Sequence, residues 1–211
     1  MRRVLTVACV GCVWIGAVEA EAAVIAFEGF GASTLFGDEN VGNGLAVATS
    51  DGFNFVSSGD HFHIGSAPGG APSNGTGVLL QDRSYSITMS KVGGGVFSLL
   101  SADLGEDISS GAGASAMSVI VTGFFSGGGS IVQEVALDGD VTSFQNELFV
   151  GFTNLTSVVF QGVGFGGPGA NGFSLDNIEV AEGVVAVAEP GTLALLGLGL
   201  VGIAASHRRK Q

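Results

Sequence analysis

The sequence predicts an all-β domain, and three of its features lead to that prediction. Its 37 glycines separate short apolar stretches along most of the chain and supply turn positions. Apolar and polar residues alternate most clearly at 85–89, 117–121 and 131–137, as expected for strands with one buried face. No stretch of the central region shows a sustained helical period. Many short strands joined by turns favour an antiparallel β-sandwich of the jelly-roll type.

The individual strands follow from β-branched and aromatic runs bounded by glycine, asparagine or serine. The segment 124–131 is typical of a hairpin, because three glycines stand between its two apolar halves. The expected strands are 24–27, 44–49, 53–57, 62–64, 77–80, 85–90, 95–100, 117–125, 129–137, 145–149, 157–161 and 173–180.

Residues 1–22 have the composition of a secretory signal peptide. Two arginines follow Met1, the stretch 4–18 is apolar, and Ala20-Glu21-Ala22 fits a small-x-small cleavage site. We expect cleavage after Ala22 or Ala23 by a general secretory route. Both cysteines of the chain lie inside this segment, so the mature protein is expected to contain no disulfide.

The C-terminal end has a three-part pattern. A linker, 182–191, is followed by the uncharged apolar stretch 192–206 and a basic tail, 207–211. A helix that is apolar all round must be buried in protein or lipid, and a basic cluster after it is typical of a cytoplasmic flank. The 15 residues would span only about 22 Å against a hydrocarbon core of about 30 Å, which favours a temporary anchor. An ordinary tail anchor or a buried helix is the alternative.

These residues resemble the PEP-CTERM sorting signal of Gram-negative bacteria, whose tail is also catalogued as an ice-binding-protein C-terminal motif. The resemblance implies export across the inner membrane, transient anchoring, and recognition by an exosortase, a membrane transpeptidase. Glu189 and Pro190 match the second and third motif positions, whereas the first is alanine instead of proline. The sorting motif would be Ala188, Glu189, Pro190 and Gly191. The stop-transfer residues would be Arg208, Arg209 and Lys210.

The remaining part, 24–181, has a length that suits a single domain. Between 24 and 188 the basic residues are Arg83 and Lys91, against 16 aspartates and glutamates. Nucleic acid as a partner is therefore excluded, because binding it requires cations that neutralise phosphates. An acidic surface keeps an exported protein soluble and leaves divalent cations as plausible companions.

This domain also resembles the ectodomain common on PEP-CTERM proteins and, in outline, galactose-binding-like jelly rolls. The resemblance is carried by the segments 25–30, 95–104 and 172–180. In such sandwiches the first and last strands often lie side by side, which would bring Glu28 and Asp176 together. Their repulsion would be relieved by Ca²⁺, which prefers oxygen ligands. The alternative is a solvated Glu28 and an Asp176 that only shapes a turn.

Three other acidic or histidine-containing segments have residues that bind metals in other proteins. His61 and His63 share one face of a strand and could hold a transition metal, although surface histidines are the more frequent case. The segments 103–107 and 138–140 resemble fragments of calcium loops, but neither completes an EF-hand. We expect both to be acidic turns.

The sequence carries no motif of nucleophilic, phosphate-binding or zinc-dependent catalysis. We therefore expect a non-catalytic exported protein of the cell surface or of the extracellular matrix, with no catalytic residue and no obligatory cofactor, and with exopolysaccharide as a candidate partner in a biofilm. The alternatives are a carbohydrate-binding module on the same sandwich and a secreted hydrolase that uses a pair of carboxylates. Sugar-binding platforms usually use Trp or Tyr, and the region after the signal peptide contains only Tyr85.

Overall fold

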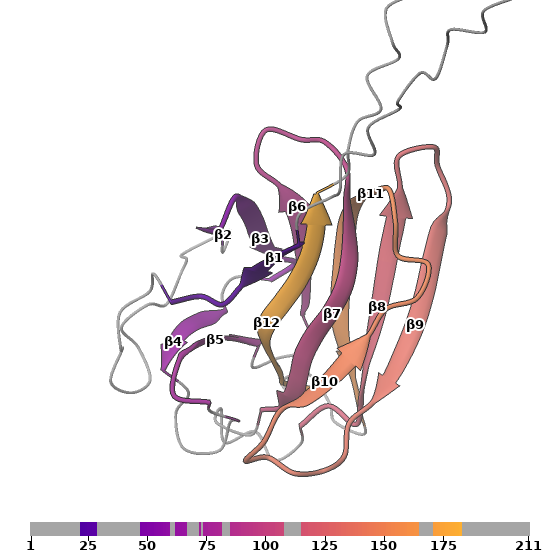
Figure 1. Ribbon diagram of the computed structural model, residues 1–211. Helices are drawn as coiled ribbons and strands as arrows, with labels where there is room; N and C mark the ends of the chain where they lie inside the picture. Colours follow the sequence, from indigo (N-terminus) through magenta and orange to yellow (C-terminus); the bar gives the residue numbers. More distant parts are fainter. Residues whose placement is uncertain are drawn as a thin grey trace, which may run out of the picture.

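The computed structural model describes residues 22–28, 47–59, 62–66, 72, 74–81, 85–107, 115–164 and 171–182. All regular secondary structure in these residues is β-strand (Figure 1). The predicted all-β fold is thereby confirmed. The strands are β1 (Ala22–Ile25), β2 (Val47–Ser50), β3 (Phe53–Ser57), β4 (His63–Ser66), β5 (Gly77–Gln81), β6 (Ser86–Lys91), β7 (Phe97–Glu106), β8 (Ser118–Phe125), β9 (Ser130–Ala136), β10 (Gln145–Leu148), β11 (Leu155–Val163) and β12 (Phe173–Glu182).

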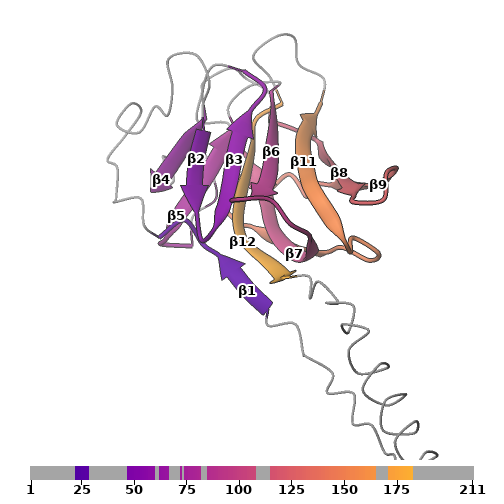
Figure 2. The same cartoon turned by 90° about the horizontal axis from the view of Figure 1, so that it is seen from above.

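The strands form two antiparallel layers, which Figure 2 shows one behind the other. The first sheet has the order β2-β3-β6-β11-β8-β9. The second sheet has the order β4-β5-β12-β7-β10, and β1 lies beside β12 as well. In the described residues, the two sheets are linked by the pairing of Leu155 with Phe97 and by a bridge between Ser115, before β8, and Gly172, before β12. The fold is a β-sandwich of the jelly-roll type.

Phenylalanine rings fill the space between the two layers. Phe53 of β3 packs edge-on against Phe97 of β7 at a centroid distance of 5.1 Å, so this contact joins the two sheets. Phe55 makes a similar edge contact, also at 5.1 Å, with Phe27, which follows β1. All four side chains are at most 2% exposed. Edge-to-face aromatic pairs stabilise a core by about 0.5–1.5 kcal/mol beyond the burial of their surface.

The expected strands correspond to the observed ones, with one substantial correction at β7. The sequence suggested an end at residue 100 and an acidic turn at 103–107, but β7 continues to Glu106. Along this strand the buried side changes from Phe97 and Leu99 to Ala102 and Leu104. Because this switch interrupts the regular alternation, the pattern alone made the strand look shorter than it is.

The free edges of β9 and β10 face each other across one side of the sandwich and are joined by side chains. The Gln133 amide of β9 donates to the Leu148 carbonyl oxygen of β10 at 3.1 Å, and the Gln145 amide of β10 donates to the Ala136 carbonyl oxygen of β9 at 2.9 Å. An exposed strand edge is a site for unwanted pairing. These two glutamines therefore occupy backbone acceptors that another strand could otherwise use.

Within the described ranges we find no helix of the length and apolarity needed to cross a membrane. The expected helix 192–206, the tail 207–211 and signal-peptide residues 1–21 lie outside those ranges. Ala22, the last residue of the expected signal peptide, is the first residue of β1, and the last strand ends at Glu182, one residue beyond the expected domain boundary.

Candidate functional site around Asp176

Asp176 of β12 and Asp103 of β7 are directly opposite each other in the second sheet. Leu175, which precedes Asp176, and Leu104, which follows Asp103, are fully buried in the core. Because successive side chains of a strand point to opposite faces, both carboxylates lie on the outer side of the sheet. The sandwich thus carries a pair of acidic groups on one of its two outer surfaces.

A bulge in β12 shapes this pair. The register shifts between Asp176 and Glu179, and Asn177 has a φ of 43°, in the left-handed region. The bulge lies where the neighbour of β12 changes from β5, paired with 173–175, to β1, paired with 178–181. A bulge turns consecutive side chains toward one face. Accordingly, the Asn177 amide reaches Asp103 and donates to its Oδ2 at 2.8 Å.

The Asp176 carboxylate accepts three hydrogen bonds. Its Oδ1 accepts the Asn177 backbone N–H at 2.8 Å. Its Oδ2 accepts the Asn74 side-chain amide at 2.6 Å and the Thr76 hydroxyl at 3.2 Å. Thr76 also donates to the Asn74 side-chain oxygen. Asp176 therefore ties the turn that precedes β5 to the last strand of the domain.

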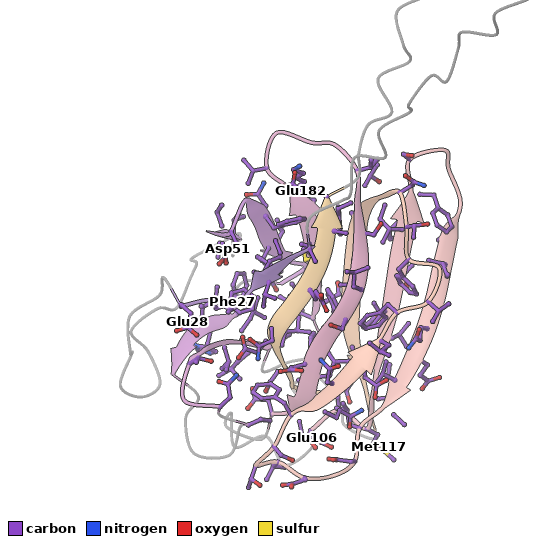
Figure 3. All side chains as sticks on the ribbon, in the orientation of Figure 1. Phe27, Glu28, Asp51, Glu106, Met117 and Glu182 are labelled. Carbon is purple, nitrogen blue, oxygen red and sulfur yellow. The ribbon has the colours of Figure 1, made fainter. Side chains whose placement is uncertain are left out.

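The segment after β1 lies against the same turn. A Cβ built on Gly77 would stand 2.4 Å from the carbonyl oxygen of Phe27, so only glycine permits this approach. Phe27 itself has a φ of 51°, which is unfavourable for a bulky residue. Figure 3 places Glu28 just beyond the end of β1, on the side of β4. The expected pairing of the first and last strands is confirmed, with Ile25 opposite Ile178.

Three segments thus bring oxygen donors to one neighbourhood. They supply the Asp176 carboxylate, the Thr76 hydroxyl, the Phe27 carbonyl and the side-chain oxygen of Asn74, which accepts from Thr76 while the Asn74 NH2 group faces Asp176. Glu28 is the next residue after Phe27 in the chain. This set suits a hard cation such as Ca²⁺, which takes carboxylate, amide and carbonyl oxygens together. In the part of the chain that the structure describes, no group of three or more His, Cys, Asp or Glu residues could hold a metal ion. A calcium site at Glu28 and Asp176 stays a prediction.

Burial is the main electrostatic influence on Asp176. The residue is 0% exposed, and this loss of hydration raises the pKa of its carboxyl above the ordinary value. The hydrogen bonds from Asn177, Asn74 and Thr76 act in the opposite direction, and the charge of Asp103 adds to the upward shift. The loss of hydration outweighs the hydrogen bonds, so the net shift of the Asp176 pKa is upward.

Asp103, the other member of the acidic pair, also contacts β10. Its Oδ1 accepts the side-chain amide of Asn146, the residue opposite it on β10, at 2.8 Å. One step along the sheet, the Ser101 hydroxyl donates to Glu179 at 3.0 Å. Leu148, opposite Ser101, is 68% exposed. The outer face of β10, β7 and β12 therefore presents a row of acidic and amide groups beside one exposed apolar side chain.

The remaining candidates are placed as follows. His63 lies in β4, but His61 is outside the described residues, so their proposed pairing stays a prediction. Residues 138–140 do form the expected acidic turn between β9 and β10. There Asp140 accepts the Thr142 hydroxyl at 2.6 Å, which lowers the pKa of its carboxyl.

Sequence reasoning identified Asp176 but missed the residues that surround it. Asn74 and Asp176 are 102 positions apart, and Asn146 and Asp103 are 43 positions apart. Asn74-Gly75-Thr76 is a turn-forming sequence, and nothing in it indicates a distant carboxylate. Asp103 was assigned to a turn because the strand around it changes its buried side.

The comparison with protein families supports the reading of the C-terminal end. Residues 186–210 match the PEP-CTERM protein-sorting motif. This match confirms the resemblance that the three-part pattern indicated. No curated protein matches the chain in sequence.

Among solved structures, the chain is similar to carbohydrate-binding modules. A family 29 module is 12% identical, with a TM-score of 0.44, over 79% of this chain and 91% of the module. The module CBM29_1 from Piromyces equi is 11% identical, with a TM-score of 0.40, over 81% and 95%. The family 32 module from C. perfringens NanJ is 12% identical, with a TM-score of 0.38, over 62% and 93%. The likeness concerns the fold alone.

The raised pKa of Asp176 predicts a particular pH dependence of stability in calcium-free buffer. The folded protein holds more protons than the unfolded chain between about pH 4 and the raised pKa, so the free energy of unfolding should fall as pH rises through that window. Asp176→Asn should lose this component in urea denaturation. Asp140→Asn is the control, because the lowered pKa of Asp140 acts only below about pH 4. An unchanged pH dependence in Asp176→Asn would contradict the assignment.

Proposed function

We propose that the chain is an exported, non-catalytic surface or extracellular-matrix protein, associated with biofilm or exopolysaccharide. In this proposal the C-terminal helix anchors it transiently in the inner membrane of a Gram-negative bacterium, and an exosortase then removes the tail. The observation that carries the proposal is the sorting-motif match at 186–210, which begins just after β12 ends at Glu182. Within the described part, every strand therefore precedes the motif, and cutting there would leave the sandwich whole.

The position of the two chain ends supports the same proposal. β1 and β12 are antiparallel, and Ala22 is opposite Ala181 (Figures 1 and 2). The expected signal peptide therefore joins the domain beside the point where the chain continues to the sorting motif. Two hydrophobic segments attached at one end of a domain can be inserted in the same bilayer without crossing or unfolding it.

The geometry of the acidic pair supports a non-catalytic role. A hydrolase that uses two carboxylates needs both within reach of the scissile bond. Asp176 is fully buried, and both oxygens of Asp176 and of Asp103 accept hydrogen bonds from asparagine groups. The pair is arranged to hold segments of the domain together.

The sorting proposal predicts the fate of the tail in two hosts. In an exosortase-bearing host, mass spectrometry should find the product without its hydrophobic tail, and an exosortase deletion should leave the tail intact in the membrane. Pro190→Ala should impair removal, because it alters the motif, whereas Glu182→Gln, at the end of β12 and outside the matched residues, should not. An intact tail in both hosts would reject the proposal.

We also propose that the oxygen cluster around Asp176 binds a structural Ca²⁺. A ligand that binds only the folded state at about 100 times its Kd adds about 2.7 kcal/mol to stability, enough to raise the Tm by several degrees. Glu28→Gln and Asp176→Asn should each abolish this rise in a thermal melt with and without calcium, whereas Asp138→Asn in the distant turn should keep it. Because Glu28 is exposed, its variant should fold even if Asp176→Asn does not. No stabilisation of the wild type by millimolar calcium would overturn the proposal.

Carbohydrate binding is the second candidate, and the polar row on β10, β7 and β12 favours it. Amide and carboxylate groups there could bind sugar hydroxyls, and Leu148 could contact an apolar sugar face. Asn146→Ala should weaken binding on a glycan array about tenfold, the value of one or two lost hydrogen bonds. Asn54→Ala, on the other sheet, should leave binding unchanged. Equal effects of the two variants would count against this face.

A further inference from the structure

The outer face of the first sheet differs sharply in charge from the rest of the domain. Strand register arranges its outward side chains in two complete rows across six strands. We call these rows the uncharged face. One row is Val47, Val56, Thr88, Val159, Thr122 and Val132. The other is Thr49, Asn54, Ser90, Ser157, Phe124 and Ser130.

Neither row contains an ionisable residue, although the chain as a whole has a formal charge of −12. A third, partial row of Ser86, Gln161, Ile120 and Glu134 brings in one carboxylate, on edge strand β9. The outer face of the second sheet, in contrast, carries Asp103, Asp176 and Glu179. Carboxylates therefore lie along the outer side of the second sheet, whereas the two complete rows of the first sheet contain none.

Apolar side chains on this face are more exposed than their chemistry favours. Val47 is 45% exposed, Val132 is 59% exposed and Phe124 is 41% exposed. Val56 and Val159 are half-buried between them. Apolar side chains thus occur from one edge of this sheet to the other, with Thr88 and Thr122 between them, and we treat the face as a candidate interaction surface.

We propose that the uncharged face is the surface by which two copies of this protein associate. The distribution of charge is the reason why we propose a second copy as the partner. Two copies of an acidic protein repel each other wherever carboxylates face carboxylates. The two complete rows contain no carboxylate. A polyanionic polymer would find no cation on this face to pair with.

Shape agrees with self-association. Two sheets with the same right-handed twist pack face to face at about 10 Å, with their strands about 30° apart, as is typical of β-sandwiches. Most residues of the two complete rows are valine, serine or threonine, whose short side chains let two such faces approach closely, and Phe124 near the β8–β9 edge is the largest side chain. The contact would be isologous, with Val159, near the middle of the face, close to its counterpart in the other copy.

The area predicts a weak contact. About 15 outward residues, spaced about 4.8 Å between strands and about 6.8 Å along them, cover about 500 Å² per copy. The total of about 1,000 Å² is at the lower limit for a specific interface. Association would be reversible in dilute solution and would increase where copies are concentrated at a surface, a consequence that rests on the proposed export.

The test is sedimentation velocity over a range of protein concentrations, with all variants purified in the same way from the exporting host. Wild type should shift from monomer to dimer as concentration rises. Val159→Glu should remain monomeric, because it opposes like charges at the centre of the contact, and Leu148→Glu, on the other sheet, should dimerise like wild type. An equimolar mixture of Val159→Glu and Val159→Lys should restore the dimer, which a merely misfolded variant could not do.

A wild type that stays monomeric at the highest concentration, or a Val159→Glu variant that dimerises normally, would overturn the proposal. Loss of glycan binding in Val159→Glu with a monomeric wild type would assign the face to a polysaccharide instead. Sedimentation does not depend on exosortase, so failure here is distinguishable from failure of the sorting proposal.

Discussion

The structure depends on how β12 is paired. On one edge β12 follows β7 over most of its length, and on the other it meets β5 first and β1 afterwards. A straight strand could not serve both neighbours with its apolar residues kept inside. The bulge between Asp176 and Glu179 resolves this, because it lets Leu175 and Ile178 both face the core. The position of Asp176 follows from that bulge.

The bulge also connects folding with chemistry. It places Asp176 in a buried position beside the turn at Asn74, against which the backbone at Phe27 packs. A carboxylate in such a position is costly unless hydrogen bonds or a cation compensate for its lost hydration. Asn74, Thr76 and Asn177 provide the hydrogen bonds. The same strand ends at Glu182, shortly before the sorting motif, so one element organises the sheet, the acidic site and the exit of the chain.

The two outer faces of the sandwich are chemically distinct. On the second sheet, Asp103 and Asp176 are held in a network of asparagine groups. On the first, Thr88 and Thr122 flank Val159, and its further outward neighbours are the uncharged residues Ser157, Gln161, Ile120 and Phe124. For an acidic protein, this asymmetry separates a face that carries carboxylates from a face whose two complete rows carry none. The self-association proposal rests on this division.

The sequence by itself determined most strand positions and the C-terminal sorting motif, and the tertiary structure decided which residues surround Asp176. Strand positions could be predicted because alternation and glycine turns are local, and the sorting motif because its three parts are contiguous. The length of β7 could not, since its buried side changes at Ser101 and Ala102. The partners of Asp176 could not either, because Asn74 reaches it only after β5 has paired with β12. Contacts between residues a hundred positions apart leave no periodic trace in a single sequence, and only the folded sheet brings them together.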